Sequence, residues 1–444
     1  MYQPSAQDNI TTGTPPPLRH YPSKIFVEVT TSCNLGCFMC VKQTGQCAIV
    51  EGEMSAETFR GLEDALPQAE TLILNGVGEP LLHPHLEDFV RRARELMPQQ
   101  SRLGFQSNGL LLDEVRAEAL IAAGLDKVCI SVDAVSQEKL QQLREGAELS
   151  GLERAFAILN RTKQKLNRPE FEIGVEIVVM RSNFRELPDT LRWAAERGAT
   201  FALVTHVLPY DGDHAGEVLY ESCSAEAIEL VDKCRRKGEA NGIDIDRYPK
   251  VIWKFSKNEE EQRVVRLVEE MKADAQAQNI FLDLKKLFEL DISHLEEVRE
   301  VFREAEKVAQ AVGLEVELPL LLLKENRRCE FVEDGSAFIS WKGDVQPCYF
   351  LWHGYHCHAS GWDQTVTPRV FGNLNDNPLL DIWNATEFRE FRESVTRYDY
   401  PYCSSCSLAP CDYIQTEEFE QDCHINKEPC GSCLWCMGLF QCLR

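Results

Sequence analysis

The stretch of sequence that decides the fold is residues 24–40, which read KIFVEVTTSCNLGCFMC. Its first six residues are rich in the aliphatic and aromatic side chains that are typical of a buried strand. Three cysteines lie in its last eight residues, with the spacing C-x3-C-x2-C. A strand that leads directly into clustered thiols predicts a loop that binds metal or performs chemistry at the end of the first strand.

Strands and helices alternate along the chain from this point to residue 208. Further apolar, β-rich segments lie at 71–74, 102–105, 127–132, 171–179 and 200–207. Helical patterns lie between them at 55–66, 85–97, 113–123, 151–166 and 185–197. This repetition predicts parallel strands joined by right-handed crossovers. Six such units predict an α/β fold, a partial (β/α)6 barrel of the TIM type, whose chemistry lies at the carboxyl ends of the strands.

Residues 210–320 are highly charged and show helical periodicity that is clearest from 295 to 312. Ser293 with Glu296 three positions later predicts a capping box at the start of this helix, and Gly313 predicts its end. The pattern favours a helical cap with a solvated face, and docking of a substrate is the alternative. We therefore expect four segments, namely a flexible lead-in (1–23), the barrel (24–209), a charged helical insertion (210–320) and an irregular, cysteine-rich domain (321–444).

The balance of charge argues against some classes of partner. Lys and Arg total 47 against 71 for Asp and Glu, which gives a formal net charge of -24. Such a field repels phosphate backbones and anionic lipids, so we expect neither a nucleic-acid nor a membrane partner. The longest apolar run, at 318–323, is far too short for a membrane span, and residues 1–19 lack the apolar core of a signal peptide. We therefore expect a cytoplasmic protein.

Cysteine is frequent, with 18 in 444 residues, and eight of these lie between Cys403 and Cys442. A framework of disulfides suits small secreted domains. Clustered thiols in a reducing cytosol more often bind metal or act in catalysis. The clustering therefore predicts metal centres near both ends of the chain.

The N-terminal thiols have the composition of an iron–sulfur site. Cys33, Cys37 and Cys40 can hold three irons of a [4Fe–4S] cluster, because thiolate is the soft ligand that such clusters require. Three thiolates leave one iron open, and an open iron can bind the amino and carboxylate groups of S-adenosylmethionine (SAM). Zinc is the alternative, although structural zinc sites usually take four ligands from paired C-x2-C knuckles.

This loop resembles the signature of radical SAM enzymes, with Met39 where the family commonly has an aromatic residue. The stretch Asn75–Pro80, NGVGEP, resembles the family's glycine-glycine-glutamate-proline element, and its glycines are expected to let the backbone approach a ligand. The resemblance implies SAM binding by Asn108 and Arg181 as well. A turn is the simpler interpretation of Asn108, and a surface ion pair is the simpler interpretation of Arg181. His206, at the end of the sixth strand, either faces the substrate or is structural. The SAM-binding residues that the resemblance implies are Gly76, Gly78, Glu79, Pro80, Ser107, Asn108, Ser131, Asp133, Glu176 and Arg181.

The resemblance also implies the reaction. In this family the three-cysteine cluster reduces SAM to methionine and a 5′-deoxyadenosyl radical, and the radical abstracts hydrogen from a substrate inside the barrel. The protein supplies binding, orientation and exclusion of water, while the cofactors supply the chemistry. A low-potential electron donor is an implied partner, and the sequence names no catalytic acid or base.

The C-terminal cysteines resemble the SPASM extension, an auxiliary-cluster domain of radical SAM enzymes that modify peptides and proteins. Cys329, Gly343 and Cys348 match the spacing of its opening motif. From residue 403 the spacing departs from the SPASM pattern C-x2-C-x5-C-x3-C, so the division of ligands between clusters stays open, with Cys436 as the first candidate for a spare. Zinc at one site is the alternative. One or two auxiliary [4Fe–4S] clusters are implied, with the candidate ligands Cys329, Cys348, Cys403, Cys406, Cys411, Cys423, Cys430, Cys433 and Cys442.

Stretches such as FGNL (371–374) and PCGSCLW (429–435) resemble a SPASM subgroup described as maturases for tungsten-pterin oxidoreductases of the aldehyde ferredoxin oxidoreductase kind. The leading hypothesis is therefore a radical SAM enzyme that modifies a protein or cofactor during maturation of a tungsten or other metalloenzyme. A peptide-crosslinking enzyme of the same architecture is the first alternative. A non-catalytic iron–sulfur electron carrier is the second, and it would not cleave SAM.

Overall fold

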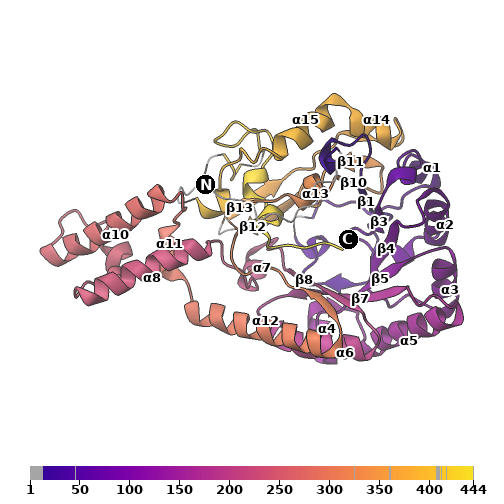
Figure 1. Cartoon of the computed structure of the whole chain (residues 1–444), viewed down its shortest axis with the longest axis horizontal. Coiled ribbons are helices and arrows are strands. Elements are labelled where there is room, and N and C mark those ends of the chain that lie inside the picture. Colours follow the sequence, from indigo (N-terminus) through magenta and orange to yellow (C-terminus); the bar gives the residue numbers. More distant parts are fainter. Residues whose placement is uncertain are drawn as a thin grey trace.

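The structure is a computed structural model, and it describes residues 14–443 except 46, 325, 360, 361, 407–410, 412 and 417. The first 13 residues of the predicted lead-in lie outside that range. The predicted parallel strands are all present and follow one another in chain order across one sheet, which curves into an open ring (Figure 1). The expected partial α/β barrel is therefore confirmed. Its strands are β1 (Lys24–Val27), β3 (Thr71–Leu74), β4 (Arg102–Ser107), β5 (Lys127–Ser131), β7 (Glu172–Val179) and β8 (Phe201–His206).

Helices lie between these strands and cover the outside of the ring (Figure 1). Each buries one apolar face, and α2 for example buries Leu86, Phe89 and Ala93 at helical spacing. Gly124 and Gly198 adopt the left-handed conformation just past helix ends, with φ of 102° and 88°. The helices are α1 (Ala56–Arg60), α2 (Leu86–Leu96), α3 (Glu114–Ala122), α4 (Gln137–Leu143), α5 (Leu149–Lys165) and α6 (Leu187–Glu196).

The sheet extends beyond both edges of the predicted barrel. Beside β8, the short strand β9 (Glu315–Glu317) pairs in parallel. Beside β1, β10 (Ser336–Ile339) pairs in parallel, and the antiparallel strands β11 (Asp344–Gln346) and β14 (Gly372–Asn373) follow it. The C-terminal region, which was expected to be irregular, thus supplies three strands to the central sheet. All four residues of β10 are buried, and the strand covers an edge that β1 would otherwise expose.

A group of helices extends away from the ring (Figure 1). Helices α8 (Ala225–Ala240) and α10 (Glu259–Ala277) pack against each other around a small apolar core that is separate from the main one, and α11 (Leu284–Glu289) contributes to it. Helix α12 (Ile292–Val312) then packs along α6 on the barrel. The charged segment after the barrel is therefore helical, as its periodicity predicted. The same segment contains the short helices α7 (Gly212–Gly216) and α9 (Tyr248–Val251).

The rest of the C-terminal region packs against the N-terminal residues. Arg392 is almost fully buried, donates from Nε to the carbonyl of Pro17 at 2.9 Å and lies over the Trp383 ring. Both ends of the described chain therefore share one hydrophobic core. The elements of this region are α13 (Glu330–Glu333), β12 (Tyr355–Ala359), β13 (Trp362–Val366), α14 (Leu379–Asn384) and α15 (Thr386–Val395).

Among the residues that the structure describes, no helix is both long enough and apolar enough to cross a membrane.

The predicted start of α12 is wrong by two residues. The helix is capped by Asp291, whose carboxylate accepts from the backbone N–H of His294 at 3.0 Å. Ser293 lies inside the first turn instead. Aspartate and serine are both good caps, but the carboxylate also places a negative charge at the positive end of the helix dipole. The predicted end is confirmed, because Gly313 is left-handed with φ of 71°.

Replacement of Asp291 by Ala removes this cap and should destabilise the first turn of α12 by about 1 kcal/mol. Ser293→Ala is the matched control and should leave the turn unchanged, because Asp291 occupies the cap position. Hydrogen exchange of the backbone amides from 292 to 295, followed by mass spectrometry, measures the difference. Equal protection in the Asp291→Ala variant and the parent protein would contradict this assignment.

Candidate active site and metal centres

A cavity of about 170 Å³ opens where the carboxyl ends of the barrel strands meet the N-terminal cysteine loop. Cys33, Cys37 and Cys40 all line it. Gln106 and Arg144 also line it, and the sequence did not point to either. Of the residues expected to bind SAM, those in the cavity wall are Gly76, Gly78, Glu79, Ser107, Asn108, Ser131 and Glu176.

A short strand pair fixes the cysteine loop in place. Strand β2 (Gly36–Cys37) pairs in antiparallel fashion with β6 (Arg144–Glu145), so Arg144 lies opposite Cys37. The Arg144 guanidinium donates from Nη1 to Cys37 Sγ at 3.7 Å and from Nε to Asp133 Oδ2 at 2.6 Å. The Asp133 side chain is fully buried, so this ion pair lies out of water next to the end of β5. Arg144 therefore joins the second cysteine to the barrel.

Burial raises the pKa of all three thiols, and that of Cys40 rises to about 11. At Cys37 the positive charge of Arg144 opposes the rise in pKa. Because a metal ligand must be the thiolate, iron binding has to displace a proton from each thiol. Metal loading of this loop is therefore more favourable at higher pH.

The glycines of the NGVGEP stretch make room for protein atoms. A Cβ on Gly78 would lie 2.3 Å from the carbonyl oxygen of Thr30 and 2.7 Å from that of Ser32. A Cβ on Gly76 would lie 2.4 Å from Cγ of Glu28. These distances are far below van der Waals contact, so the turn after β3 packs directly on the backbone that leads into the thiols. The glycines thus serve the packing of the cysteine loop as well as lining the cavity.

Glu79 is almost fully buried, and protein donors already hold its carboxylate. Its Oε1 accepts from Ser107 Oγ at 2.8 Å and from the Leu81 backbone N–H at 3.0 Å. Its Oε2 accepts from the Asn108 backbone N–H at 2.7 Å. A carboxylate offers roughly four acceptor positions, so one remains for a cationic donor such as an ammonium group. Burial raises the pKa of Glu79, and these hydrogen bonds oppose the rise.

Two other groups tie the cavity wall together. Asn108 donates from Nδ2 to Asn34 Oδ1 at 2.8 Å, which joins the end of β4 to the cysteine loop. Glu176, near the middle of β7, is half-buried beside Arg144 and Asp133. Burial raises the pKa of Glu176, while the Arg144 charge opposes the rise. The cavity wall therefore carries carboxylate, hydroxyl and amide groups from four neighbouring strands.

Three of the expected SAM-binding residues lie outside this cavity wall. Asp133 is held by Arg144 and by a backbone N–H of β7, which donates to its Oδ1 at 2.8 Å. Pro80 begins a buried 3-10 turn. Arg181 is exposed, and its Nε donates to the Val218 carbonyl at 3.1 Å. Contact of these residues with SAM stays a prediction.

His206 ends β8 in an apolar setting. Its Nε2 lies 2.8 Å from the carbonyl oxygen of Leu320, and burial lowers its pKa to about 4. Its ring packs against Tyr220 and Phe440. These contacts favour the structural interpretation of this histidine.

The donor set of the cysteine loop fits an iron–sulfur cluster. Within the described ranges, no three His, Cys, Asp or Glu side chains converge as the ligands of a single metal ion would. In a cubane each thiolate binds a different iron, so the ligands surround a cluster and need not meet at one point. The three thiols face one cavity, as the ligands of a cluster must. The carboxylate acceptor position lies beside them, and the cavity leaves space for SAM as well as the cluster.

The first group among the C-terminal thiols contains Cys329, Cys348, Cys430 and Cys433, which are buried or half-buried. Burial is the main cause that raises the pKa of Cys348 and Cys430, and the neighbouring thiols Cys329 and Cys433 raise both further. The pKa of Cys329 is raised by burial and then by Cys433. Such mutual influence requires proximity, so four cysteines that are far apart in sequence lie together.

The second group contains Cys403, Cys406, Cys411 and Cys423. Burial raises the pKa of Cys403 first, and Cys423, Cys411 and Cys406 each raise it further. Cys423 is exposed, unlike the other three. Its position in the sequence lies beyond Gln415, where the SPASM spacing counted from Cys411 would place a cysteine.

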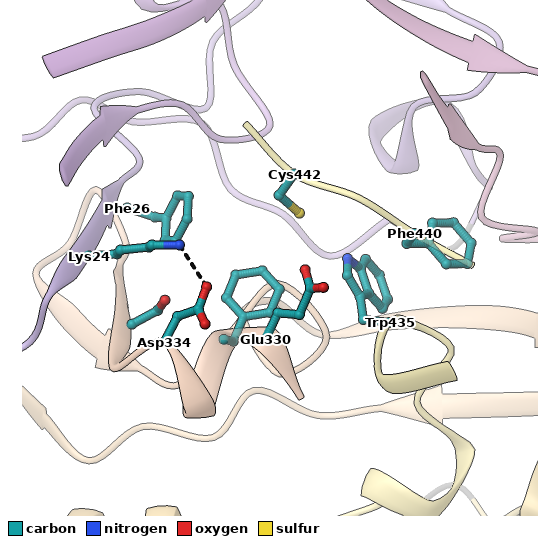
Figure 2. A pocket seen from close by; sticks show the side chains of 9 residues that line it. Lys24, Phe26, Glu330, Asp334, Trp435, Phe440 and Cys442 are labelled. Carbon is teal, nitrogen blue, oxygen red and sulfur yellow. Dashed lines mark hydrogen bonds and ion pairs between the residues drawn. The ribbon is translucent and has the colours of Figure 1, made fainter. Parts of the chain in front are cut away.

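Two more C-terminal cysteines have other surroundings. Cys436 donates from Sγ to the carbonyl oxygen of Cys433 at 3.0 Å, so its thiol already has a backbone partner. Cys442, which was expected to be a ligand, lines a different cavity of about 30 Å³, with Phe26 on one side and Trp435 on the other (Figure 2). The same cavity contains the ion pair between Lys24 and an aspartate of the C-terminal region.

Known proteins match the same two parts of the chain. Residues 27–194 match the radical SAM superfamily, and residues 329–407 match the SPASM iron–sulfur cluster-binding domain. The chain is 27% identical to the tungsten-containing aldehyde ferredoxin oxidoreductase cofactor-modifying protein of Pyrococcus furiosus, over 94% of this chain and 96% of that protein. It is 22% identical to the AdoMet-dependent heme synthase of Methanosarcina barkeri, over 90% of this chain and 96% of that protein.

The fold has a counterpart among solved structures. SuiB of Streptococcus suis bound to S-adenosylmethionine superposes with a TM-score of 0.51 at 12% identity, covering 91% of this chain and 77% of SuiB. The domains imply SAM, a SAM-binding [4Fe–4S] cluster and auxiliary iron–sulfur clusters as cofactors. With these matches and the cavity of three thiols, the chain belongs to the radical SAM enzymes that carry a C-terminal SPASM domain.

Proposed function

We propose that this enzyme modifies a metal cofactor, or the metalloprotein that carries it, during maturation of a tungsten-pterin or related oxidoreductase. The observation that carries the proposal is the similarity to the Pyrococcus furiosus cofactor-modifying protein, which spans both the barrel and the C-terminal thiols. The Methanosarcina barkeri relative is also named for work on a metal cofactor. Crosslinking of a short peptide is the alternative.

In this proposal Cys33, Cys37 and Cys40 hold the SAM-binding cluster. When bound, SAM and the cluster supply an electron transfer and a hydrogen-abstracting radical. The chain itself binds and orients: the free acceptor position of Glu79 receives the SAM ammonium, and Glu176 with the other polar wall residues receives the ribose hydroxyls. The buried Arg144 holds the loop against the barrel, and the buried wall excludes water.

We further assign the auxiliary ligands. The first buried group holds one [4Fe–4S] cluster and the second group holds another, while Cys436 and Cys442 bind neither. The pairwise influence of the thiols within each group supports the two groups, and the hydrogen bond from Cys436 Sγ to the Cys433 carbonyl supports leaving Cys436 out. The reaction also requires a low-potential electron donor, and a reducing cytoplasm would keep the remaining cysteines from forming disulfides. The two ligand groups are Cys329, Cys348, Cys430, Cys433 and Cys403, Cys406, Cys411, Cys423.

Anaerobic incubation of the reconstituted enzyme with SAM, a chemical reductant and a purified tungsten-pterin oxidoreductase tests the substrate. We expect 5′-deoxyadenosine in proportion to a mass change of the cofactor released from the oxidoreductase. A triple alanine variant of the N-terminal thiols should form no 5′-deoxyadenosine and should keep about eight of about twelve irons, at four irons per cubane. An unaltered cofactor, with a short precursor peptide consumed instead, would favour the crosslinking alternative.

Gly78→Ala should weaken SAM binding about tenfold, which corresponds to about 1.4 kcal/mol. The added methyl group would collide with the Thr30 and Ser32 backbone and push the cysteine loop away from the barrel. Gly216→Ala is the matched control, because a Cβ there meets no atom within 4 Å. The measurement is equilibrium binding of SAM to both variants after iron–sulfur reconstitution. Equal affinities would contradict this role of Gly78.

Single alanine variants test the assignment of the auxiliary ligands. Cys430→Ala and Cys423→Ala should each lower the iron content by about four, since each removes a ligand of a different cubane. Cys436→Ala and Cys442→Ala should keep the full iron content. Iron and sulfide analysis after anaerobic reconstitution is the readout. Loss of a cluster in Cys442→Ala, with retention in Cys430→Ala, would reverse the assignment.

A further inference from the structure

Arg327 is a buried cation for which no described residue supplies a hydrogen-bond acceptor. Arg327 lies two positions before Cys329 in the sequence, and only 8% of its surface is exposed. All three guanidinium nitrogens are buried, and no described residue accepts a hydrogen bond from any of them. An arginine stays charged in proteins, and a buried charge without a partner costs several kcal/mol as an order of magnitude. The chain would not be expected to bury this group unless something else supplies the acceptors.

The protein groups around Arg327 do not supply an anion. Its guanidinium carbon lies 3.5 Å from the centre of the Tyr402 ring, which gives a cation–π contact but no hydrogen bond. The nearby carboxylates are engaged elsewhere: Glu333 pairs with Arg328 and accepts from Tyr398, and Asp334 pairs with Lys24. Among the described residues, the five N–H donors of the guanidinium therefore have no acceptor, which leaves them available to a bound group.

The thiols of the first group lie next to this guanidinium. The backbone N–H of Arg328 donates to the Cys436 carbonyl at 2.9 Å, which holds the arginine segment against the Cys433–Cys436 turn. The positive charge of Arg327 also lies close enough to act on the thiol of Cys433. Charge and geometry thus place the guanidinium beside a ligand of the first auxiliary cluster.

We propose that Arg327 donates hydrogen bonds to the sulfur atoms of the auxiliary cluster held by Cys329, Cys348, Cys430 and Cys433, and that it raises the reduction potential of that cluster. The inference rests on the ligand assignment made above. A cubane with four thiolates is anionic and gains a further negative charge on reduction. A cation in contact with it therefore stabilises the reduced form more than the oxidised form. Hydrogen bonds to sulfur and local charge are known determinants of cluster potential.

The test is a redox titration of the full-length chain, followed by electron paramagnetic resonance. The background carries alanines at Cys33, Cys37 and Cys40, so only the auxiliary clusters contribute signals. Arg327→Gln should shift one auxiliary midpoint to a more negative potential and leave the other unchanged. Arg327→Lys should stay close to the background protein, because it keeps the charge. The matched control Arg328→Gln should shift neither midpoint, because its side chain is exposed and already pairs with Glu333 and Asp334.

Each outcome decides the proposal. Unchanged midpoints in Arg327→Gln at full iron content would overturn it, and so would an equal shift in Arg327→Lys. If Arg327→Gln binds fewer irons, Arg327→Lys decides: full iron with an unshifted midpoint supports the proposal, and iron loss there too overturns it. A background protein that lacks two auxiliary clusters would instead refute the ligand assignment, which separates that failure from a failure of the role of Arg327.

Discussion

The Arg144 guanidinium lies between a buried aspartate at the end of β5 and the thiol of Cys37, and the position of the cysteine loop depends on it. Removal of either charge would leave the other buried without a partner, which typically costs about 3–5 kcal/mol. The backbone adds a second restraint, because Arg144 belongs to the strand that pairs with the loop. Gly78 adds a third by packing on Thr30 just ahead of the thiols. The barrel therefore holds the loop that carries all three thiols in place.

Two buried arginines, Arg144 and Arg327, lie beside thiols in a chain whose formal net charge is -24. The first is neutralised by Asp133, and the second has no described anionic partner. This difference in partners matches the iron–sulfur chemistry expected in the N-terminal loop and in the C-terminal region. The cluster of the N-terminal loop has to keep one iron open for SAM. Arg144 holds that loop in position and does not need to contact the iron. In our proposal the first C-terminal group supplies four thiols, and Arg327 lies beside the anionic cluster that they hold.

Much of this architecture could be predicted from the sequence, because it follows local rules. The barrel strands have continuous apolar runs, and the loop of three cysteines has a distinctive spacing. The two-residue strand that carries Arg144 is too short to leave a periodic signal, so its role emerges only from tertiary pairing. The grouping of Cys423 with Cys403 is likewise set by the path of the chain. Arg327 carries no pattern at all, since an unpartnered guanidinium is visible only once its surroundings are known.

The pairing of β10 with β1 also has a consequence for biosynthesis. Lys24 meets Ser336 in the sheet, so the first strand emerges from the ribosome roughly three hundred residues before its neighbour. At synthesis rates of about 5–20 residues per second, that delay lasts on the order of 15–60 s. During this interval β1 is an edge strand with unpaired backbone N–H and C=O groups, and such an edge favours aggregation. Production of this protein should therefore respond to chaperone supply, and a version shortened before residue 336 should be poorly soluble.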